Sequence, residues 1–186
     1  YKVFFSADQK YFTIVNSKRI ACFEFPSYRK VSELNFPGLV YDIKITSADG
    51  RRILMKTTDG YYAVIDCIRG AVTGKFKPER TVNHVSATAD LSVAAFSQTG
   101  SPDFAEIVDM TKSRPLKVLL LEGFNIRKSF LSRDGKTCVS TGANSMNLMM
   151  MKIFDVSSGK LISEILSDPE KIAGFSSDGK RFYTWG

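Results

Sequence analysis

Histidine and tryptophan are nearly missing from this 186-residue sequence, which contains one residue of each. A single histidine, His84, excludes an ordinary zinc site with two histidine ligands and a haem held by a histidine pair. No Gly-x-Ser-x-Gly segment is present to expose a nucleophile, so the usual serine-hydrolase arrangement is excluded as well. We therefore expect a protein that is not an enzyme, with no catalytic residues, no metal site and no cofactor, and a structural role for His84 within a strand.

Cysteine is also scarce, and long apolar runs are missing. Cys22, Cys67 and Cys138 are odd in number and form no Cys-x-x-Cys pair, which favours buried reduced thiols. Apolar stretches such as Val118–Leu121 fall far short of the ~18 residues that a membrane span needs. No secretory signal and no Asn-x-Ser/Thr acceptor is found. These features predict a cytoplasmic protein without a transmembrane segment, with the nucleus as the alternative location.

What the sequence does contain is one short turn in five copies. The copies place an aspartate every 41 to 44 residues. They are Ser6-Ala7-Asp8-Gln9, Ser47-Ala48-Asp49-Gly50, Thr88-Ala89-Asp90-Leu91, Ser132-Arg133-Asp134-Gly135 and Ser176-Ser177-Asp178-Gly179. A period in the forties, built of short strands, is typical of a radial repeat architecture.

Each copy of the turn lies between segments with the composition of strands. In the second copy the expected strands are 41–46, 52–57, 61–66 and 71–76, separated by Asp49-Gly50, Thr58-Asp59-Gly60 and Arg69-Gly70. In four of the repeats the third strand ends in an apolar residue followed by an acid. These pairs are Phe23-Glu24, Ile65-Asp66, Val108-Asp109 and Phe154-Asp155. The pattern predicts an all-β fold, with residues 1–186 forming part of one β-propeller of four-stranded antiparallel blades. About four and a half blades are expected, roughly at 1–37, 40–78, 82–123, 124–167 and, in part, 171–186.

This arrangement resembles the WD-repeat family. The best match runs from Thr46-Ser47-Ala48-Asp49-Gly50 through Asp59 to Ile65-Asp66, with the family's spacing of seven residues between the last two acids. The repeats are degenerate, because no third strand ends in Trp-Asp and no Gly-His dipeptide precedes a repeat. Propellers of the TolB type or those attached to peptidases have similar turns, and Phe175 to Lys180 would suit either. The resemblance implies a non-catalytic scaffold for protein–protein interactions.

Four and a half blades provide no obvious closing blade for the ring. Because the sequence also begins at Tyr1 rather than at methionine, we expect a segment of a larger propeller in a longer, multidomain protein. A compact five-bladed ring is the alternative. A second functional alternative is a propeller that is accessory to an enzyme, either an NTPase-coupled sensor or a peptidase.

The net charge of +7 and the pI near 9.3 direct attention to the basic residues. Two of the three turns in each blade share one face of a propeller, and 14 of the 26 lysines and arginines are expected there. The candidate binding residues are Arg51, Arg52, Lys112, Arg114, Arg133, Lys136, Lys180 and Arg181. They would dock a protein or peptide partner with acidic character, unless they are simply solvated turn residues. Phosphoinositide or nucleic-acid binding is a further alternative, although base reading is not expected because no exposed aromatic is evident beyond Tyr28.

Three other patterns have simpler explanations. Gly70 to Phe76 is read as a turn plus a strand rather than a phosphate loop, because no Ser or Thr follows Lys75. The turn aspartates are too far apart in sequence for a shared calcium site. The methionines at 146 and 149–151 are expected to fill irregular space in and beside a strand.

Overall fold

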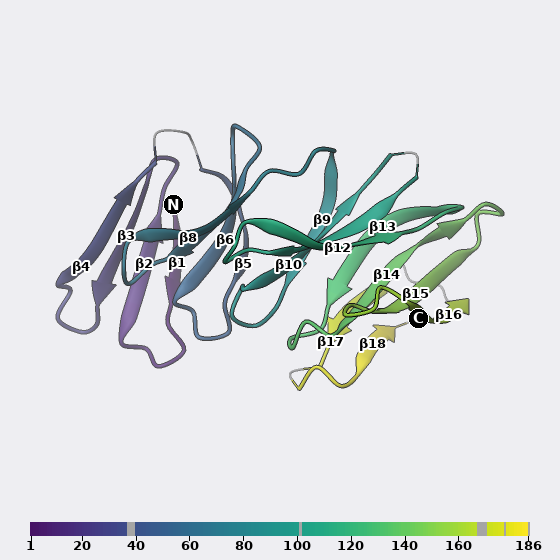
Figure 1. Ribbon diagram of the computed structural model, residues 1–186. Helices are drawn as coiled ribbons and strands as arrows, with labels where there is room; N and C mark the ends of the chain where they lie inside the picture. Colours follow the sequence, from purple (N-terminus) through teal and green to yellow (C-terminus); the bar gives the residue numbers. More distant parts are fainter. Residues whose placement is uncertain (37–39, 101, 167–170, 177, 186) are drawn as a thin grey trace. The chain divides into compact units, whose positions relative to one another are not determined.

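The computed structural model describes residues 1–36, 40–100, 102–166, 171–176 and 178–185 (Figure 1). Within these ranges the chain forms strands β1 to β18 and no helix. The strands make four four-stranded antiparallel sheets and one two-stranded sheet, and every sheet follows chain order. The all-β prediction is therefore confirmed, and the sheets have the meander topology of propeller blades.

The bounds of the strands define the blades. Blade 1 contains β1 (Lys2–Phe5), β2 (Tyr11–Val15), β3 (Arg19–Glu24) and β4 (Lys30–Asn35). Blade 2 contains β5 (Val40–Thr46), β6 (Arg52–Thr57), β7 (Tyr62–Asp66) and β8 (Ala71–Phe76). Blade 3 contains β9 (Val82–Ala87), β10 (Val93–Gln98), β11 (Phe104–Asp109) and β12 (Arg114–Leu120). Blade 4 contains β13 (Phe124–Leu131), β14 (Thr137–Asn144), β15 (Met149–Asp155) and β16 (Leu161–Leu166), and the last sheet pairs β17 (Lys171–Phe175) with β18 (Phe182–Trp185).

The repeated turn has a repeated hydrogen-bond network. In blade 1 the Ser6 hydroxyl donates to the Asp8 carboxylate at 2.6 Å, and the backbone N–H of Tyr11 donates to the Ser6 oxygen at 3.0 Å. The same serine-to-aspartate bond recurs at 2.6 Å in blade 2, 2.7 Å in blade 4 and 2.5 Å in the last sheet. Because all partners lie within five residues of one another, the local sequence is sufficient to specify this turn.

The residue after each turn aspartate has a positive φ. Gly50, Gly135 and Gly179 take this conformation at 68°, 73° and 71°, whereas Gln9 and Leu91 take it at 56° and 59°. A side chain makes this backbone region costly, so the turn geometry is kept in blades 1 and 3 against the residues' own preference. In blade 1 the hydrogen bonds to Asp8 therefore outweigh the cost of a positive φ at Gln9.

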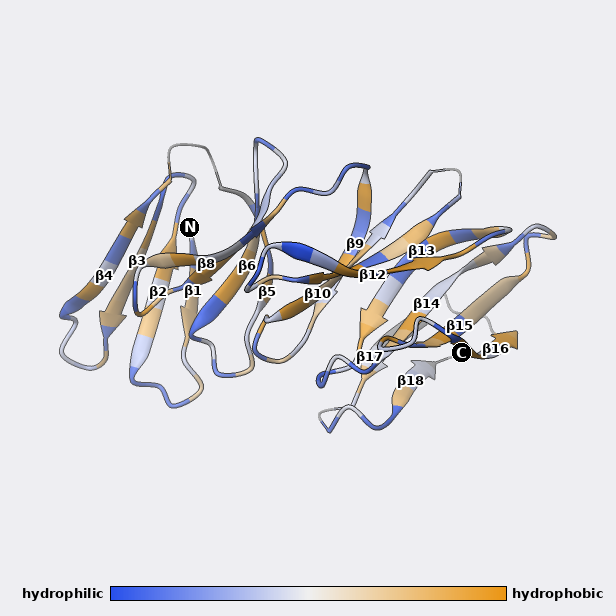
Figure 2. Ribbon diagram, in the orientation of Figure 1, coloured by the Kyte–Doolittle hydropathy of each residue, from blue (hydrophilic) through white to orange (hydrophobic). Residues whose placement is uncertain are grey.

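The chain forms two compact units. Unit 1 comprises Tyr1–Lys77, Ala89–Leu91 and Met110–Ser113, and unit 2 comprises Pro78–Thr88, Ser92–Asp109 and Arg114–Gly186. In unit 1 blades 1 and 2 pack through a buried core of Val15, Ile20, Cys22, Ile53, Met55, Ala63, Ile65 and Cys67. In unit 2 blades 3 and 4 pack through a second core that includes Ala95, Ile107, Leu119, Ile126, Leu131 and Phe154. Hydrophobic residues lie largely in the strands, and hydrophilic residues gather in the turns (Figure 2).

The three cysteines and the single histidine lie in buried or half-buried environments. Cys22, Cys67 and Cys138 are free and buried, and burial raises the pKa of the Cys67 and Cys138 thiols to about 12. The Nδ1 atom of His84 lies 2.9 Å from the Ser129 carbonyl oxygen in blade 4, with its ring 4.9 Å from Phe130. A search of the described residues also finds no helical segment with the length and apolarity that crossing a bilayer requires.

Candidate functional site

The first and third turns of a blade lie next to each other. In blade 4 the N–H of Val156, in the third turn, donates to the carbonyl oxygen of Lys136, beside the first turn, at 2.8 Å. The equivalent bond joins Phe25 to Lys10 in blade 1 at 2.8 Å, and Cys67 to Arg51 in blade 2 at 2.9 Å. Basic residues from both turns therefore share a surface within each of these three blades, as the strand order predicts.

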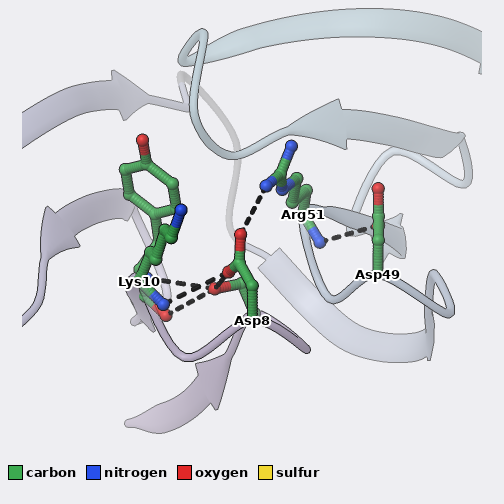
Figure 3. Close-up of polar contacts among 6 residues, drawn as sticks. Asp8, Lys10, Asp49 and Arg51 are labelled. Atoms are coloured by element: carbon green, nitrogen blue, oxygen red, sulfur yellow. Dashed lines mark hydrogen bonds and ion pairs between the residues drawn. The ribbon is translucent and has the colours of Figure 1, made fainter.

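In unit 1 two candidate residues are occupied by contacts between blades. The Arg51 guanidinium of blade 2 donates to the Asp8 carboxylate of blade 1 at 2.6 Å (Figure 3). Arg52 donates to the carbonyl oxygen of Asp90 at 2.8 Å. Lys112, the third candidate of this unit, is exposed in the turn after β11. Arg51 and Arg52 thus bind neighbouring turns of the same unit, a role that the sequence did not reveal.

The turn network and Arg51 act on the same carboxylate. Hydrogen bonds from the Ser6 hydroxyl and the Lys10 backbone N–H, followed by the Arg51 guanidinium, lower the pKa of Asp8 from 3.8 to about 2. Arg51 in turn donates its backbone N–H to Asp49 at 3.0 Å, in the first turn of its own blade (Figure 3). Both turns are therefore connected through one arginine.

In unit 2 the five candidate residues, together with Lys117 and Lys160, lie at or beside four turns. We call this group the basic surface of unit 2. Its members are Arg114, Lys117, Arg133, Lys136, Lys160, Lys180 and Arg181. A methyl group at Gly179 would lie 3.5 Å from the Arg133 nitrogen, which places the last sheet's turn against that of blade 4. A methyl group at Gly159 would lie 3.0 Å from the Lys117 Cδ atom, so the Lys117 stem passes beside the turn that carries Lys160.

The acids of this surface are held by their own turns. Hydrogen bonds from Ser157, Ser158 and the Ser158 backbone lower the pKa of Asp155 to about 2. Hydrogen bonds from Ser132 and Ser176 lower the pKa of Asp134 and Asp178 in the same way. These carboxylates stay ionised at neutral pH and offset part of the positive charge, but their oxygens are directed to local donors.

Among the described residues, most cations of this surface form no ion pair with those acids. Across the described ranges of unit 2, no ion pair involves Arg114, Arg133, Lys180 or Arg181. Lys136 approaches Asp134 at 3.9 Å, and its side chain is 80% exposed. Such an exposed pair contributes little and leaves the ammonium accessible to a partner.

The structure corrects the expectation that Tyr28 is the one evident exposed aromatic residue. Tyr28 is exposed as predicted, but Phe5 and Phe25 are exposed too, at 56% and 41%, although they belong to or adjoin strands of blade 1. Their rings lie 6.3 Å apart. The alternation of residues along β1 shows which side chains share a face, but it could not show that this face is uncovered.

Two other features of the described residues concern metal binding and cavities. A search of them finds no group of three or more His, Cys, Asp or Glu side chains that could hold a metal ion. A cavity of about 190 Å³ in unit 1 is lined by Leu34, Phe36, Thr57, Asp59, Val72 and Lys75. The Asp59 carboxylate in it accepts the Thr57 hydroxyl, and the Lys75 ammonium lies 3.7 Å from the centre of the Tyr61 ring, so its charged groups already have partners.

Comparisons with known proteins identify the fold. A chain of hydrazine synthase from Kuenenia stuttgartiensis aligns with 95% of this chain, with a TM-score of 0.61 and 15% sequence identity. The match covers 52% of that chain, so the present chain spans about half of its length. No family model matches the sequence, and a search of curated proteins finds no match. At this identity the likeness concerns the fold alone, and together with the four-stranded sheets it shows a partial β-propeller.

Proposed function

We propose that this chain is a WD-repeat-like propeller segment that serves as a non-catalytic scaffold and binds an acidic protein or peptide. The basic surface of unit 2 is the proposed binding site. The observation that carries the proposal is that the acidic and the basic residues of these turns have different contacts. The aspartates are bound by their own serines and backbone, whereas Arg133, Lys180 and Arg181 extend to solvent.

The supporting argument is electrostatic. Exposed cations on adjacent turns raise the local concentration of an acidic ligand and speed its association. The turns that carry them are rigid, because each is fixed by hydrogen bonds such as that from the Thr137 N–H to the Ser132 oxygen at 3.0 Å. A rigid array of charges loses little conformational freedom on binding, apart from the lysine and arginine side chains themselves.

The test is a triple charge reversal of Arg133, Lys136 and Lys180 to glutamate in the natural full-length protein. The probe is a fluorescein-labelled glutamate-rich peptide, with binding followed by anisotropy at 50 and 200 mM NaCl. We expect the reversal to weaken binding at least about tenfold at low salt, and we expect higher salt to weaken wild-type binding.

The matched control reverses Lys18, Lys77 and Lys128, which are exposed outside these turns. The control changes the net charge by the same amount, so equal losses in both variants would show that only overall charge matters and would contradict the proposed site. A stronger response to phosphoinositide vesicles or single-stranded DNA than to the peptide would contradict a protein partner.

A further inference from the structure

One face of blade 1 carries aromatic and aliphatic side chains that are exposed or only half-buried. Its members are Val3, Phe5, Phe12, Ile14, Phe23, Phe25 and Tyr28, and we call it the aromatic face of blade 1. The pairing of Phe5 with Phe12, and of Phe12 with Phe23, places these three rings on one side of the sheet. Neighbouring centroids lie 5.9 and 5.2 Å apart.

Blade 2 shows what normally covers such a face. Counted from the turn aspartate, Phe12 and Ile14 correspond to Ile53 and Met55. Ile53 and Met55 are completely buried, because the opposite face of blade 1 packs on them. Counted from the strand-end acid, Phe23 corresponds to Ile65, which is also completely buried. The aromatic face of blade 1 is thus equivalent to the face of blade 2 that contacts its neighbouring blade.

The charged residues beside this face also indicate that another blade covers it. Lys10 holds the position in blade 1 that Arg51 holds in blade 2, two residues after the turn aspartate (Figure 3). Arg51 uses that position to bind Asp8 in the turn of the neighbouring blade at 2.6 Å. Across the residues that the structure covers, no ion pair of the Lys10 ammonium is found. An acidic turn residue on the occupant would complete the same contact.

We propose that the aromatic face of blade 1 is the docking surface of a further blade of the same polypeptide, whose first turn offers an acidic side chain to Lys10. The occupant is a four-stranded sheet with a small or aliphatic face, as blade 1 itself presents Val15, Ile20 and Cys22 to blade 2. The proposal is independent of the basic surface of unit 2.

The test measures access to the face in the natural full-length protein. Phe5→Cys carries a thiol on the face, and Met146→Cys carries one at a residue that is 72% exposed in a turn of unit 2. The native cysteines give a low background, because Cys22, Cys67 and Cys138 are buried. We expect maleimide to label Phe5→Cys about 100-fold more slowly than Met146→Cys, since labelling would require the blades to open.

Three outcomes would overturn the proposal. Labelling of both thiols at similar rates would show that the face is open, and Val3→Cys repeats the measurement if Phe5→Cys does not fold. Protection that disappears on dilution would assign the cover to a second copy instead. In the Phe5→Cys background, Lys10→Glu should increase the labelling rate about tenfold, and Lys18→Glu should not. Equal effects of the two substitutions would contradict the contact between Lys10 and an acidic turn residue.

Discussion

The guanidinium of Arg51 and the carboxylate of Asp8, 43 positions apart in the chain, form a 2.6 Å hydrogen-bonded ion pair between blades 1 and 2. The pair joins two copies of the same turn, and each copy is also closed by its own serine. One side chain therefore connects a local motif to the packing of neighbouring blades.

Breaking this pair should lower stability by a small amount. Both side chains are partly exposed, at 44% and 33%, so water and salt screen the attraction. We expect Arg51→Ala and Asp8→Asn each to lower the urea midpoint, and the double variant to lose less than the sum of the two. Strictly additive losses at low salt would show that the pair does not couple the blades. An interaction energy unchanged at 1 M NaCl would show that the coupling is not that of a screened ion pair.

Exchanging residues at the positive-φ position should change stability in opposite directions in two blades. Gln9→Gly removes the cost of a side chain at φ 56° and should stabilise by up to about 1 kcal/mol. Gly50→Ala places a Cβ atom 2.5 Å from the Phe5 carbonyl oxygen and should destabilise by about 2 to 4 kcal/mol. Urea unfolding measures both, and a destabilising Gln9→Gly would show that the Gln9 side chain makes a compensating contact.

Stability should fall in acid. The pKa values of Asp8 and Asp155 are about 2, below the ordinary 3.8, because serine hydroxyls and backbone N–H groups donate to them. A carboxyl with a lower pKa in the folded state stabilises the fold at pH values above about 4, and this contribution is lost as the pH falls towards 2. We expect the urea midpoint to drop between pH 4 and 2.

The source of that acid sensitivity can be tested with Ser6→Ala. Removing the hydroxyl donor should raise the pKa of Asp8 towards 3.8 in an NMR titration of its carboxyl carbon. Asp155 has separate donors and serves as the internal control, so a shift of both carboxyls would indicate a general loosening of the fold.

The native thiols should be inert until the protein unfolds. Cys22, Cys67 and Cys138 are buried, and burial raises the pKa of the last two to about 12, so their thiolates are scarce at neutral pH. We expect no maleimide labelling within the time that an exposed thiol needs, and complete labelling in 8 M urea. Rapid labelling of one native cysteine, located by mass spectrometry, would show local opening at that blade.

His84→Ala should cost stability rather than a bound metal. The His84 ring contacts the Ser129 carbonyl oxygen at 2.9 Å and packs against Phe130, both in the following blade. We expect a loss of about 2 to 3 kcal/mol in urea unfolding, since the carbonyl of the buried Ser129 loses its partner and a ring contact is removed. Adding EDTA to the wild type should leave the unfolding curve unchanged, and a shifted curve would indicate a metal.

The sequence by itself determined the turns, the strand order and most strand bounds. The spans 52–57 and 71–76 are found as predicted, because short turns with local hydrogen bonds and a positive-φ residue precede both strands. Such contacts lie inside the window that alternation and turn chemistry can show.

The tertiary structure decided which side chains remain available to a partner. Arg51 and Arg133 are both arginines beside a first-turn aspartate, yet Arg51 binds Asp8 of the preceding blade, while Arg133 is exposed to solvent. Likewise Phe12 and Ile53 hold equivalent places, but blade 1 packs over Ile53 and leaves its own Phe12 only half-buried. These differences depend on residues about one blade apart in the chain, and no local pattern records which of two equivalent faces is covered.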